Sequence, residues 1–435
     1  MLPRLFFLVR QNASRGGRRI SRRIPHPAQD IVKGMRLRGV LLVAATLLAA
    51  TVVFHAADNP KLPPPYATPS ADNRPHVIPE PAGSKLNVPS GFRMEIWSDD
   101  GYRRPRFMML GPRNEVLLAD AAPRPNGTIY VFAPGSTRKK ALITGLYQPY
   151  GMAYLDGNLY VAEPDSVKRY KYDSQAMTAG PGQEIISMKG IDTHHWTRTL
   201  LIDRAGKKLY VSVGSGSNSS PGEDPRRAAI NRYNLDGSDH EIFASGLRNP
   251  VGLRWYPGTD ALWAAVQERD DLGDNLVPDY LTHVQQGGFY GWPYAYIGSH
   301  IDPTNKEIVA KDPHVAELVK KSIVPDVLLG SHVAVLDFLF YTGKQFPAEY
   351  QGGAFLAFHG SWNRSKRVGY SIAFVPFQNG RPSGPPRDVV TGWMLSPEQR
   401  DVWGRPVGLL QLPDGSLLIS EDGNNRLWHL SYSGK

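Results

Sequence analysis

The chain contains no cysteine among its 435 residues. This absence excludes disulfide bridges, thiolate nucleophiles, zinc or iron–sulfur sites held by cysteine, lipoprotein attachment and covalently bound c-type haem. Whatever compartment the protein occupies, its stability must come from a packed hydrophobic core rather than from cross-links.

Most of the chain also lacks an excess of either charge, although the formal net charge is +10. Ten of the 50 Lys and Arg residues, and only one of the 40 acids, lie within the first 38 residues. The remainder therefore carries 40 basic and 39 acidic side chains. A basic surface that follows phosphates is not expected, and we predict no nucleic-acid partner.

An uncharged apolar run, residues 39–54, follows the basic stretch and ends just before His55, Ala56 and Ala57. This layout is typical of an export signal and predicts a periplasmic location. The run lies near the boundary between a signal segment and a short membrane anchor, so cleavage near Ala56 and attachment to the inner membrane through residues 39–57 are alternatives. We expect residues 1–57 to be this export or anchor segment and the Pro-rich residues 58–90 to be a linker.

Long helical periodicity is absent from the rest of the chain, where 43 Gly and 37 Pro indicate many short strands joined by turns. Six short runs of apolar, branched and aromatic residues recur. Most of them are preceded by another apolar strand and a turn, as in a hairpin. These runs are Glu115–Asp120, Gly157–Glu163, Lys208–Val213, Ala261–Val266, Gly353–His359 and Gly415–Glu421.

The spacing of these runs, roughly 40 to 50 residues for the first four, suits one four-stranded blade per repeat. A longer gap follows the fourth run and predicts an insertion from about Pro278 to Val333. Closing six sheets into a ring protects edges that would otherwise be exposed. We therefore predict that residues 91–435 form an all-β, six-bladed β-propeller, with a β-sandwich as the structural alternative.

Several motifs lie in turns between these strands. GLRNPVG (246–252) stands just before a strand, QERDDLGDN (267–275) follows it, and GGFYGWP (287–293) comes next. The acids of the second motif are close enough for their carboxylates to enclose a hard cation such as calcium. By chemistry alone, a solvated acidic loop is an equally open interpretation.

Further motifs follow the same pattern: HHWTR (194–198), VSVGSGSN (211–218), HGSWNR (359–364) and GRPVG (404–408). Together with the motifs above, they resemble the soluble quinoprotein glucose and aldose dehydrogenases in sequence and order, over roughly residues 90 to 430. The similarity is greatest to the sorbosone dehydrogenase relatives of that family.

The resemblance implies pyrroloquinoline quinone (PQQ) as the cofactor. PQQ carries three carboxylates, so its pocket needs fixed cations and amide donors. The implied cofactor-binding residues are Gln148, Arg248, Asn249, Arg364 and Arg405, with Lys366 or Arg367 as alternatives to Arg364.

The resemblance also implies a catalytic histidine before the strand that begins near Arg198, because a dehydrogenase of this kind needs a base for the hydroxyl proton. The spacing to Arg198 favours His194, whereas the motif HWTR favours His195, so both histidines are candidates. Arg248 belongs to the same predicted catalytic set. Calcium is the implied metal, held by the backbone carbonyl oxygens of Arg269 and Asp270 and by the carboxylate of Asp274. The glucose-oxidising members have Gly-Pro where this chain has Arg269 and Asp270, which leaves the ligands open.

The expected function is oxidation of an aldose or a sorbosone-like sugar aldehyde by hydride transfer to PQQ. Without cysteine for a covalent haem, the electrons must pass to a separate acceptor. Two other classes remain: a calcium-dependent propeller hydrolase such as a lactonase, and a propeller that binds a partner or glycan without catalysis.

Overall fold

The computed structural model describes residues 59–191 and 194–434. The predicted export or anchor segment, residues 1–57, lies outside the described residues. Within the described ranges, no helix is long and apolar enough to cross a membrane.

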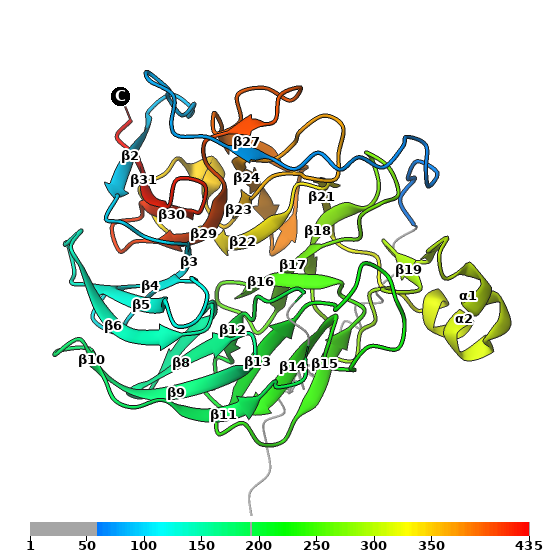
Figure 1. Cartoon of the computed structure of the whole chain (residues 1–435), viewed down its shortest axis with the longest axis horizontal. Helices are drawn as coiled ribbons and strands as arrows, with labels where there is room; N and C mark the ends of the chain where they lie inside the picture. Colours follow the sequence, from blue (N-terminus) through cyan, green and yellow to red (C-terminus); the bar gives the residue numbers. More distant parts are fainter. Residues whose placement is uncertain (1–58, 192–193, 435) are drawn as a thin grey trace, which may run out of the picture. The chain divides into compact units, whose positions relative to one another are not determined.

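Six antiparallel sheets form the fold, and we call them blades one to six in chain order (Figure 1). Blade one contains β3 (Pro105–Leu110), β4 (Val116–Asp120), β5 (Gly127–Phe132) and β6 (Lys139–Leu146). Blade two contains β7 (Met152–Leu155), β8 (Asn158–Glu163), β9 (Ser166–Asp173), β10 (Thr178–Ala179) and β11 (Gln183–Ser187). Blade three contains β12 (Leu200–Ile202), β13 (Lys208–Val213), β14 (Ala229–Asn234) and β15 (Glu241–Ser245).

The later blades follow the same plan. Blade four contains β16 (Asn249–Trp255), β17 (Leu262–Gln267), β18 (Pro278–His283) and β21 (Val327–Ser331). Blade five contains β22 (Val335–Phe340), β23 (Ala354–Phe358), β24 (Ser371–Val375) and β27 (Arg387–Val390). Blade six contains β29 (Pro406–Gln411), β30 (Leu417–Glu421), β31 (Arg426–Tyr432) and β2 (Phe92–Ser98).

The blades close into a ring. The first strands β3, β7, β12, β16, β22 and β29 each contact the next, and β29 contacts β3. The ring is locked where β2, from the beginning of the described chain, pairs with β31 near its end, as the adjacent blue and red strands of Figure 1 show. The predicted six-bladed β-propeller is confirmed.

All six runs singled out in the sequence form the second strand of a blade. Their side chains are buried on both faces; Leu117, Leu159 and Leu209, for example, have no exposed surface. The reason is that each blade is packed between two neighbours, so a second strand has a core on either side. This double burial explains the near-continuous apolar composition of the runs.

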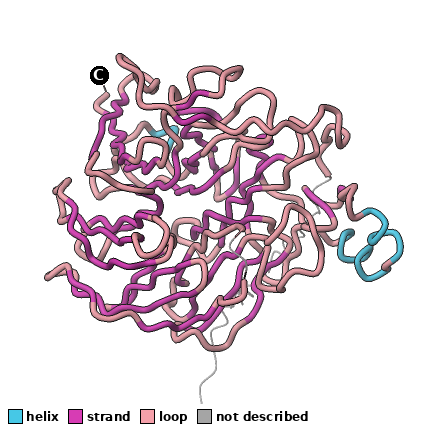
Figure 2. The backbone as a smooth tube through the Cα atoms, in the orientation of Figure 1, coloured by secondary structure: helices cyan, strands magenta, loops and turns pink. Residues whose placement is uncertain are grey.

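The insertion is shorter than the sequence predicted. Its expected bounds, 278–333, include β18 and β21, which are regular strands of blade four. The true insertion lies between them and contains β19 (Ala295–Tyr296), β20 (His300–Ile301), α1 (Lys306–Lys311) and α2 (Pro313–Lys320). These helices stand out against the strands in Figure 2. The expected bounds were wrong because long-range pairing, which the local pattern does not reveal, makes β18 and β21 part of the blade.

Residues 59–90, which we call the strap, lie on the propeller instead of standing free of it. Strap strand β1 (His76–Val77) pairs in parallel with β28 (Asp401–Val402). The Asn73 N–H donates to the Trp362 carbonyl oxygen over 2.8 Å, and the Asn87 N–H donates to that of Thr391 over 2.8 Å. Apart from β1 the strap has no regular strand or helix, as its proline content predicts. Backbone hydrogen bonds nevertheless attach the strap to the propeller.

Candidate functional site

The loops that enter the first strands meet at one end of the ring. His195 precedes β12, Arg248 precedes β16, His332 precedes β22 and Arg405 precedes β29, and all four line one cavity of about 650 Å³. Loops at the ends of scaffold strands are where binding residues usually gather. The cavity is also lined by His194, Gln267, Glu268, Asp270, Asp279, Ala334, Trp362 and, from the strap, Arg74, Pro75 and Val77.

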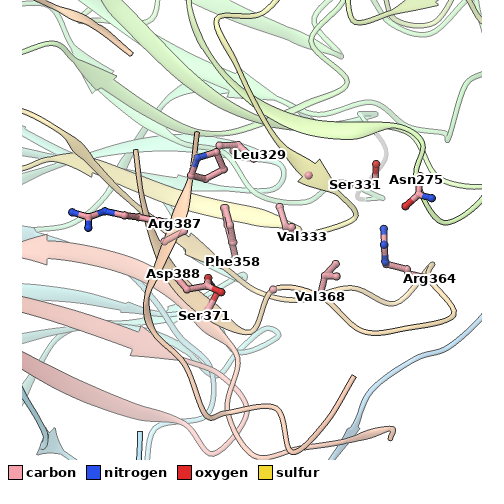
Figure 3. A pocket seen from close by; sticks show the side chains of 14 residues that line it. Asn275, Leu329, Ser331, Val333, Phe358, Arg364, Val368, Ser371, Arg387 and Asp388 are labelled. Atoms are coloured by element: carbon pink, nitrogen blue, oxygen red, sulfur yellow. Dashed lines mark hydrogen bonds between the residues drawn. The ribbon is translucent and has the colours of Figure 1, made fainter. Parts of the chain in front are cut away.

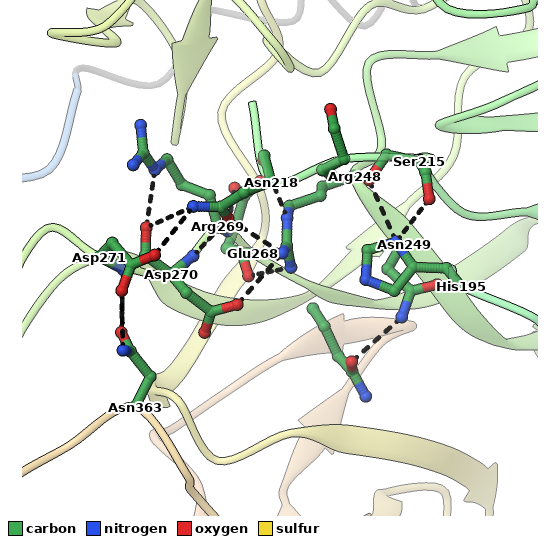
Figure 4. A network of polar contacts seen from close by, with 12 residues as sticks. His195, Ser215, Asn218, Arg248, Asn249, Glu268, Arg269, Asp270, Asp271 and Asn363 are labelled. Atoms are coloured by element: carbon green, nitrogen blue, oxygen red, sulfur yellow. Dashed lines mark hydrogen bonds and ion pairs between the residues drawn. The ribbon is translucent and has the colours of Figure 1, made fainter. Parts of the chain in front are cut away.

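His195 is held in one orientation by Ser215. The ring nitrogen Nδ1 lies 2.7 Å from the carbonyl oxygen of Ser215 and 3.1 Å from its hydroxyl, as the dashed lines of Figure 4 show. A carbonyl oxygen only accepts hydrogen bonds, so Nδ1 carries the proton and the opposite nitrogen, Nε2, carries the lone pair. Burial, followed by the positive charge of Arg248 and by His194, holds the pKa of His195 well below its usual value. The ring is therefore neutral at neutral pH and suited to accept a proton.

The structure brings both candidate histidines to the cavity but places them differently. The ring centroids of His194 and His195 are 4.6 Å apart in an edge-to-face arrangement. The side chain of His194 is exposed, whereas His195 is partly buried and anchored to Ser215. Among these two, the anchored and neutral His195 has the geometry expected of a base.

A glycine makes room for His195. A Cβ atom on Gly214 would lie 2.5 Å from Cβ of His195 and 2.3 Å from Oδ1 of Asn249, closer than real Cβ atoms approach other atoms. Asn249 is buried, and its Nδ2 donates to Oε1 of the cavity residue Gln267 over 3.1 Å. Asn249 therefore lies directly behind the cavity wall.

Arg248 is fixed by four hydrogen bonds, which use four of the five N–H donors of its guanidinium group. Nη2 donates to Oδ2 of Asp270 over 3.1 Å and to Oδ1 of Asn218 over 3.0 Å, and Nη1 donates to the Glu268 carbonyl oxygen. Only 5% of the Arg248 side chain is exposed. Figure 4 shows its guanidinium group among Asn218, Glu268 and Asp270. A planar cation held this firmly is preorganised to face a carboxylate.

Two acidic side chains of the cavity wall, Glu268 and Asp279, have raised pKa values. Burial raises the pKa of Glu268 to about 8, so its carboxyl group is largely protonated at neutral pH. Burial also raises the pKa of Asp279 to about 6. The Asp279 carboxylate accepts the N–H groups of Glu268 over 3.0 Å and of Ala334 over 2.7 Å, which ties blade four to the entry loop of blade five.

The residues predicted to hold calcium do not assemble into one cation site. Nη1 of Arg269 donates to both carboxylate oxygens of Asp302, over 2.8 and 2.7 Å. The Asp270 carboxylate faces Arg248 and His332, whereas that of Asp274 accepts the Ser365 N–H over 2.8 Å. Within the described ranges, no group of three or more His, Asp or Glu side chains is arranged to hold a metal ion. The carbonyl oxygen of Asp270, one of the expected ligands, accepts hydrogen bonds from Nδ2 of Asn218 over 3.1 Å and from Nε of Arg269 over 3.0 Å, and a calcium requirement stays a prediction.

Arg405 reaches the cavity from blade six. Its Nε donates to the His359 carbonyl oxygen over 3.3 Å, and Nε2 of His359 lies 2.7 Å from Oδ1 of Asp422. Burial, together with the charge of Arg405, lowers the pKa of His359 to about 3, so His359 is neutral. Asp422 also pairs with Arg106, so one carboxylate serves several guanidinium groups at this end of the ring.

Arg364 does not join Arg248 and Arg405. It lines a second cavity of about 480 Å³ together with Asn275, Ser331 and Val333, as Figure 3 shows. Its Nη1 donates to the carbonyl oxygen of Asp274.

The other cofactor residues named from the sequence also lie apart from the first cavity. Lys366 pairs with Glu398 on the surface, and buried Arg367 donates to Oδ1 of Asn73 in the strap over 2.7 Å. Gln148 lies before β7 with a left-handed φ of 42° and is not among the residues that line the first cavity. Of the five cofactor residues named from the sequence, only Arg248 and Arg405 line the cavity of His195, with Asn249 directly behind it.

Sequence reasoning missed several residues of the cavity. His332 carries the same signal as Arg248 and Arg405, since it stands just before the first strand of a blade. Asp279 is the second residue of a strand that the sequence assigned to the insertion. Arg74 had no signal, because a Pro-rich segment gives no indication of which surface it covers.

Comparison with known proteins supports this picture. The family model described as TrAA12-like matches residues 86–433. The chain belongs to the TrAA12-like family. The resemblance to soluble PQQ-dependent sugar dehydrogenases, inferred above from motifs, is confirmed.

Three relatives illustrate the family. An uncharacterized protein of Borreliella burgdorferi is 27% identical over 82% of this chain and 93% of its own length. A pyrroloquinoline quinone-dependent pyranose dehydrogenase of Coprinopsis cinerea is 24% identical over 79% of this chain and 54% of its own length, so this chain spans about half of that relative. The structure of a Trichoderma reesei protein of Carbohydrate-Active Enzymes family AA12 is 25% identical, with a TM-score of 0.67 over 80% of this chain and 98% of that one.

Proposed function

We propose that this protein is a PQQ-dependent dehydrogenase that oxidises a sugar, with His195 as the general base. The observation that carries the proposal is the position of His195: neutral, anchored through Nδ1, and on the same cavity wall as two arginines from different blades. The pyranose dehydrogenase relative, named for its use of PQQ, supports the choice of cofactor.

The cavity has the size of a ligand pocket and contains two guanidinium groups that would face the carboxylates of PQQ. Ligand pockets commonly enclose about 300 to 1,000 Å³, and this one encloses about 650 Å³. Arg248 and Arg405 would face carboxylates of the cofactor, since guanidinium groups bind carboxylates through charge-assisted hydrogen bonds. When bound, PQQ supplies the hydride acceptor that protein side chains lack.

Nε2 of His195 would then take the proton of the substrate hydroxyl while a hydride leaves the carbon atom that bears this hydroxyl. An aldehyde substrate would react as its hydrate, which carries the needed hydroxyl. The Ser215 carbonyl oxygen holds the ring in one tautomer, and after proton transfer it also accepts from a charged imidazolium. The electrons would leave to a separate acceptor.

The finer points of the proposal concern substrate and location. We propose an aldose or a sorbosone-like sugar aldehyde as the substrate, following the motif resemblance. We also propose that the protein works in the periplasm, because residues 1–57 have the layout of an export or anchor segment.

The test is dye reduction by the apoprotein after addition of PQQ, with and without calcium, over a panel of aldoses and sugar aldehydes. The proposal predicts turnover that depends on PQQ. No PQQ binding together with no turnover on the whole panel would overturn it. Cleavage of a lactone without PQQ would instead assign the protein to the hydrolases.

A further inference from the structure

The strap forms part of the wall of the reaction cavity. Arg74, Pro75 and Val77 line it together with His194, His195 and Arg248. The family match begins at residue 86, so these three residues precede the part of the chain that the family model covers. The cavity is thus built from the family's propeller and from a segment outside the match.

The strap is anchored just before Arg74. The side-chain nitrogen of Asn73 donates to the carbonyl oxygens of Arg364 over 3.0 Å and of Ser365 over 2.9 Å. Its side-chain oxygen accepts from Nη2 of the buried Arg367 over 2.7 Å. These bonds fix the strap to the loop that follows β23.

The strap is also anchored at Arg74 itself. The carbonyl oxygen of Arg74 accepts a hydrogen bond from Nε of Arg400 over 2.8 Å. The backbone here is therefore held in place before any ligand arrives, which lowers the entropy cost of forming a contact.

The side chain of Arg74, by contrast, remains available. Its guanidinium carbon lies 5.2 Å from the ring centroid of Trp362, another residue of the cavity wall. It pairs with Asp72 over 3.1 Å, and 69% of the side chain is exposed. Arg74 and Trp362 together present hydrogen-bond donors next to an aromatic ring.

We propose that Arg74 and Trp362 form the sugar-contacting wall of the site and that Arg74 is a specificity-determining residue. This inference rests on the proposed function. Arg74 lies over one face of the Trp362 indole, and its guanidinium N–H groups donate to the sugar hydroxyls. The pair that Arg74 forms with Asp72 is exposed on both sides and therefore weak, so the guanidinium group can give it up for the hydroxyls of a sugar.

The test compares Arg74→Ala with Arg93→Ala in the full chain loaded with PQQ. Arg93 is a matched control: 69% of its side chain is exposed, and it pairs with an acid two residues away, Glu95, over 3.4 Å, but it lies in β2, outside the cavity lining. Loss of hydrogen bonds to the sugar should raise the KM of Arg74→Ala about fivefold. The kcat, the PQQ affinity and the melting temperature should stay unchanged, and Arg93→Ala should match the wild type in all four.

Arg74→Lys separates charge from shape. It keeps the positive charge but loses the planar donors, so KM should lie between the values for the wild type and Arg74→Ala. Equal KM values for Arg74→Ala and Arg93→Ala on every sugar of the panel would overturn the proposal. That result is distinct from failure of the proposed function, in which the wild type itself shows no PQQ-dependent turnover.

Discussion

At the scale of single residues, His195 gains its character from contacts on different sides of one ring. Ser215 fixes the tautomer at Nδ1, and burial beside Arg248 keeps the imidazole neutral. A histidine in water would be partly protonated near its ordinary pKa and free to rotate. The surroundings thus convert a common side chain into a base with a defined lone pair.

This leads to a prediction for His195→Gln, which removes the base while keeping a polar side chain of similar length. We expect kcat to fall by about 10²- to 10⁴-fold, the usual contribution of general base catalysis, with PQQ affinity retained. His194→Gln is the control, and its kcat should remain close to the wild type. In the wild type, the loss of kcat/KM that protonation of His195 causes should appear only well below pH 6.5, because the pKa of His195 is lowered. Equal losses in both variants would contradict the assignment.

Glu268 gives a second prediction, on stability. Its pKa is raised from 4.5 to about 8 by burial, so the folded state holds a proton that the unfolded state releases between these pH values. The stability due to the neutral carboxyl group is fully present below pH 4.5 and is lost as the pH rises toward 8. Glu268→Gln cannot ionise, so its melting temperature should decline less than that of the wild type between pH 5 and pH 8.5. Parallel melting curves over this range would show that Glu268 is ionised throughout.

At the scale of elements, the second strands of several blades end in an acid that binds the loop entering the first strand. Asp120 accepts the N–H of Arg103 over 3.1 Å, Glu163 that of Tyr147 over 3.3 Å, and Glu421 that of Arg405 over 3.2 Å. These bonds hold the entry loops of blades one, two and six, and the loop of blade six carries the cavity residue Arg405. The recurring runs therefore encode more than a strand, since their final carboxylates also position the loop beside them.

The runs were predictable because double burial leaves a strong apolar signal, and all six became second strands. The bounds of the insertion were not predictable to the same degree. The strand β18 (PDYLTH) is short and follows an acidic loop, and only its pairing with β17 identifies it as part of a blade. Local composition carries no information on such a partner.

The hydrophobic core that blade five shares with Leu409 and Leu417 of blade six yields a third prediction. Phe355 of β23 is fully buried, and its ring centroid lies 5.0 Å from that of Phe374 and 5.5 Å from that of Tyr350. Phe355→Ala should lower the free energy of unfolding by about 3 to 5 kcal/mol through loss of buried area and creation of a cavity. Leu395→Ala, at a side chain that is 45% exposed, should change it by less than about 0.5 kcal/mol. Denaturant unfolding of both variants measures the difference, and similar values would contradict the packing.

At the scale of the whole molecule, the site exists only because ring closure brings loops from several blades together. The sequence named Arg248, Arg405 and Arg364 together as cofactor-binding residues, with the strongest support for Arg248, yet Arg364 faces another cavity. The loop 331–334 shows why: His332 and Ala334 line the first cavity, whereas Ser331 and Val333 line the second. His332 and Ala334 have left-handed φ angles of 66° and 55° in this connection, so neighbouring residues face different cavities and a shift of one residue changes the cavity that a side chain enters. A sequence motif does not reveal which cavity each of its residues faces.

This separation of the arginines allows a direct test of where the cofactor binds. We would follow the absorbance of PQQ as it is added to the wild-type apoprotein and to Arg248→Ala, Arg405→Ala and Arg364→Ala. Loss of a charge-assisted bond should weaken binding about 10- to 100-fold in the first two variants, whereas Arg364→Ala should bind like the wild type. PQQ affinity that is lost in Arg364→Ala and kept in Arg248→Ala and Arg405→Ala would contradict the assignment of the cavity beside His195.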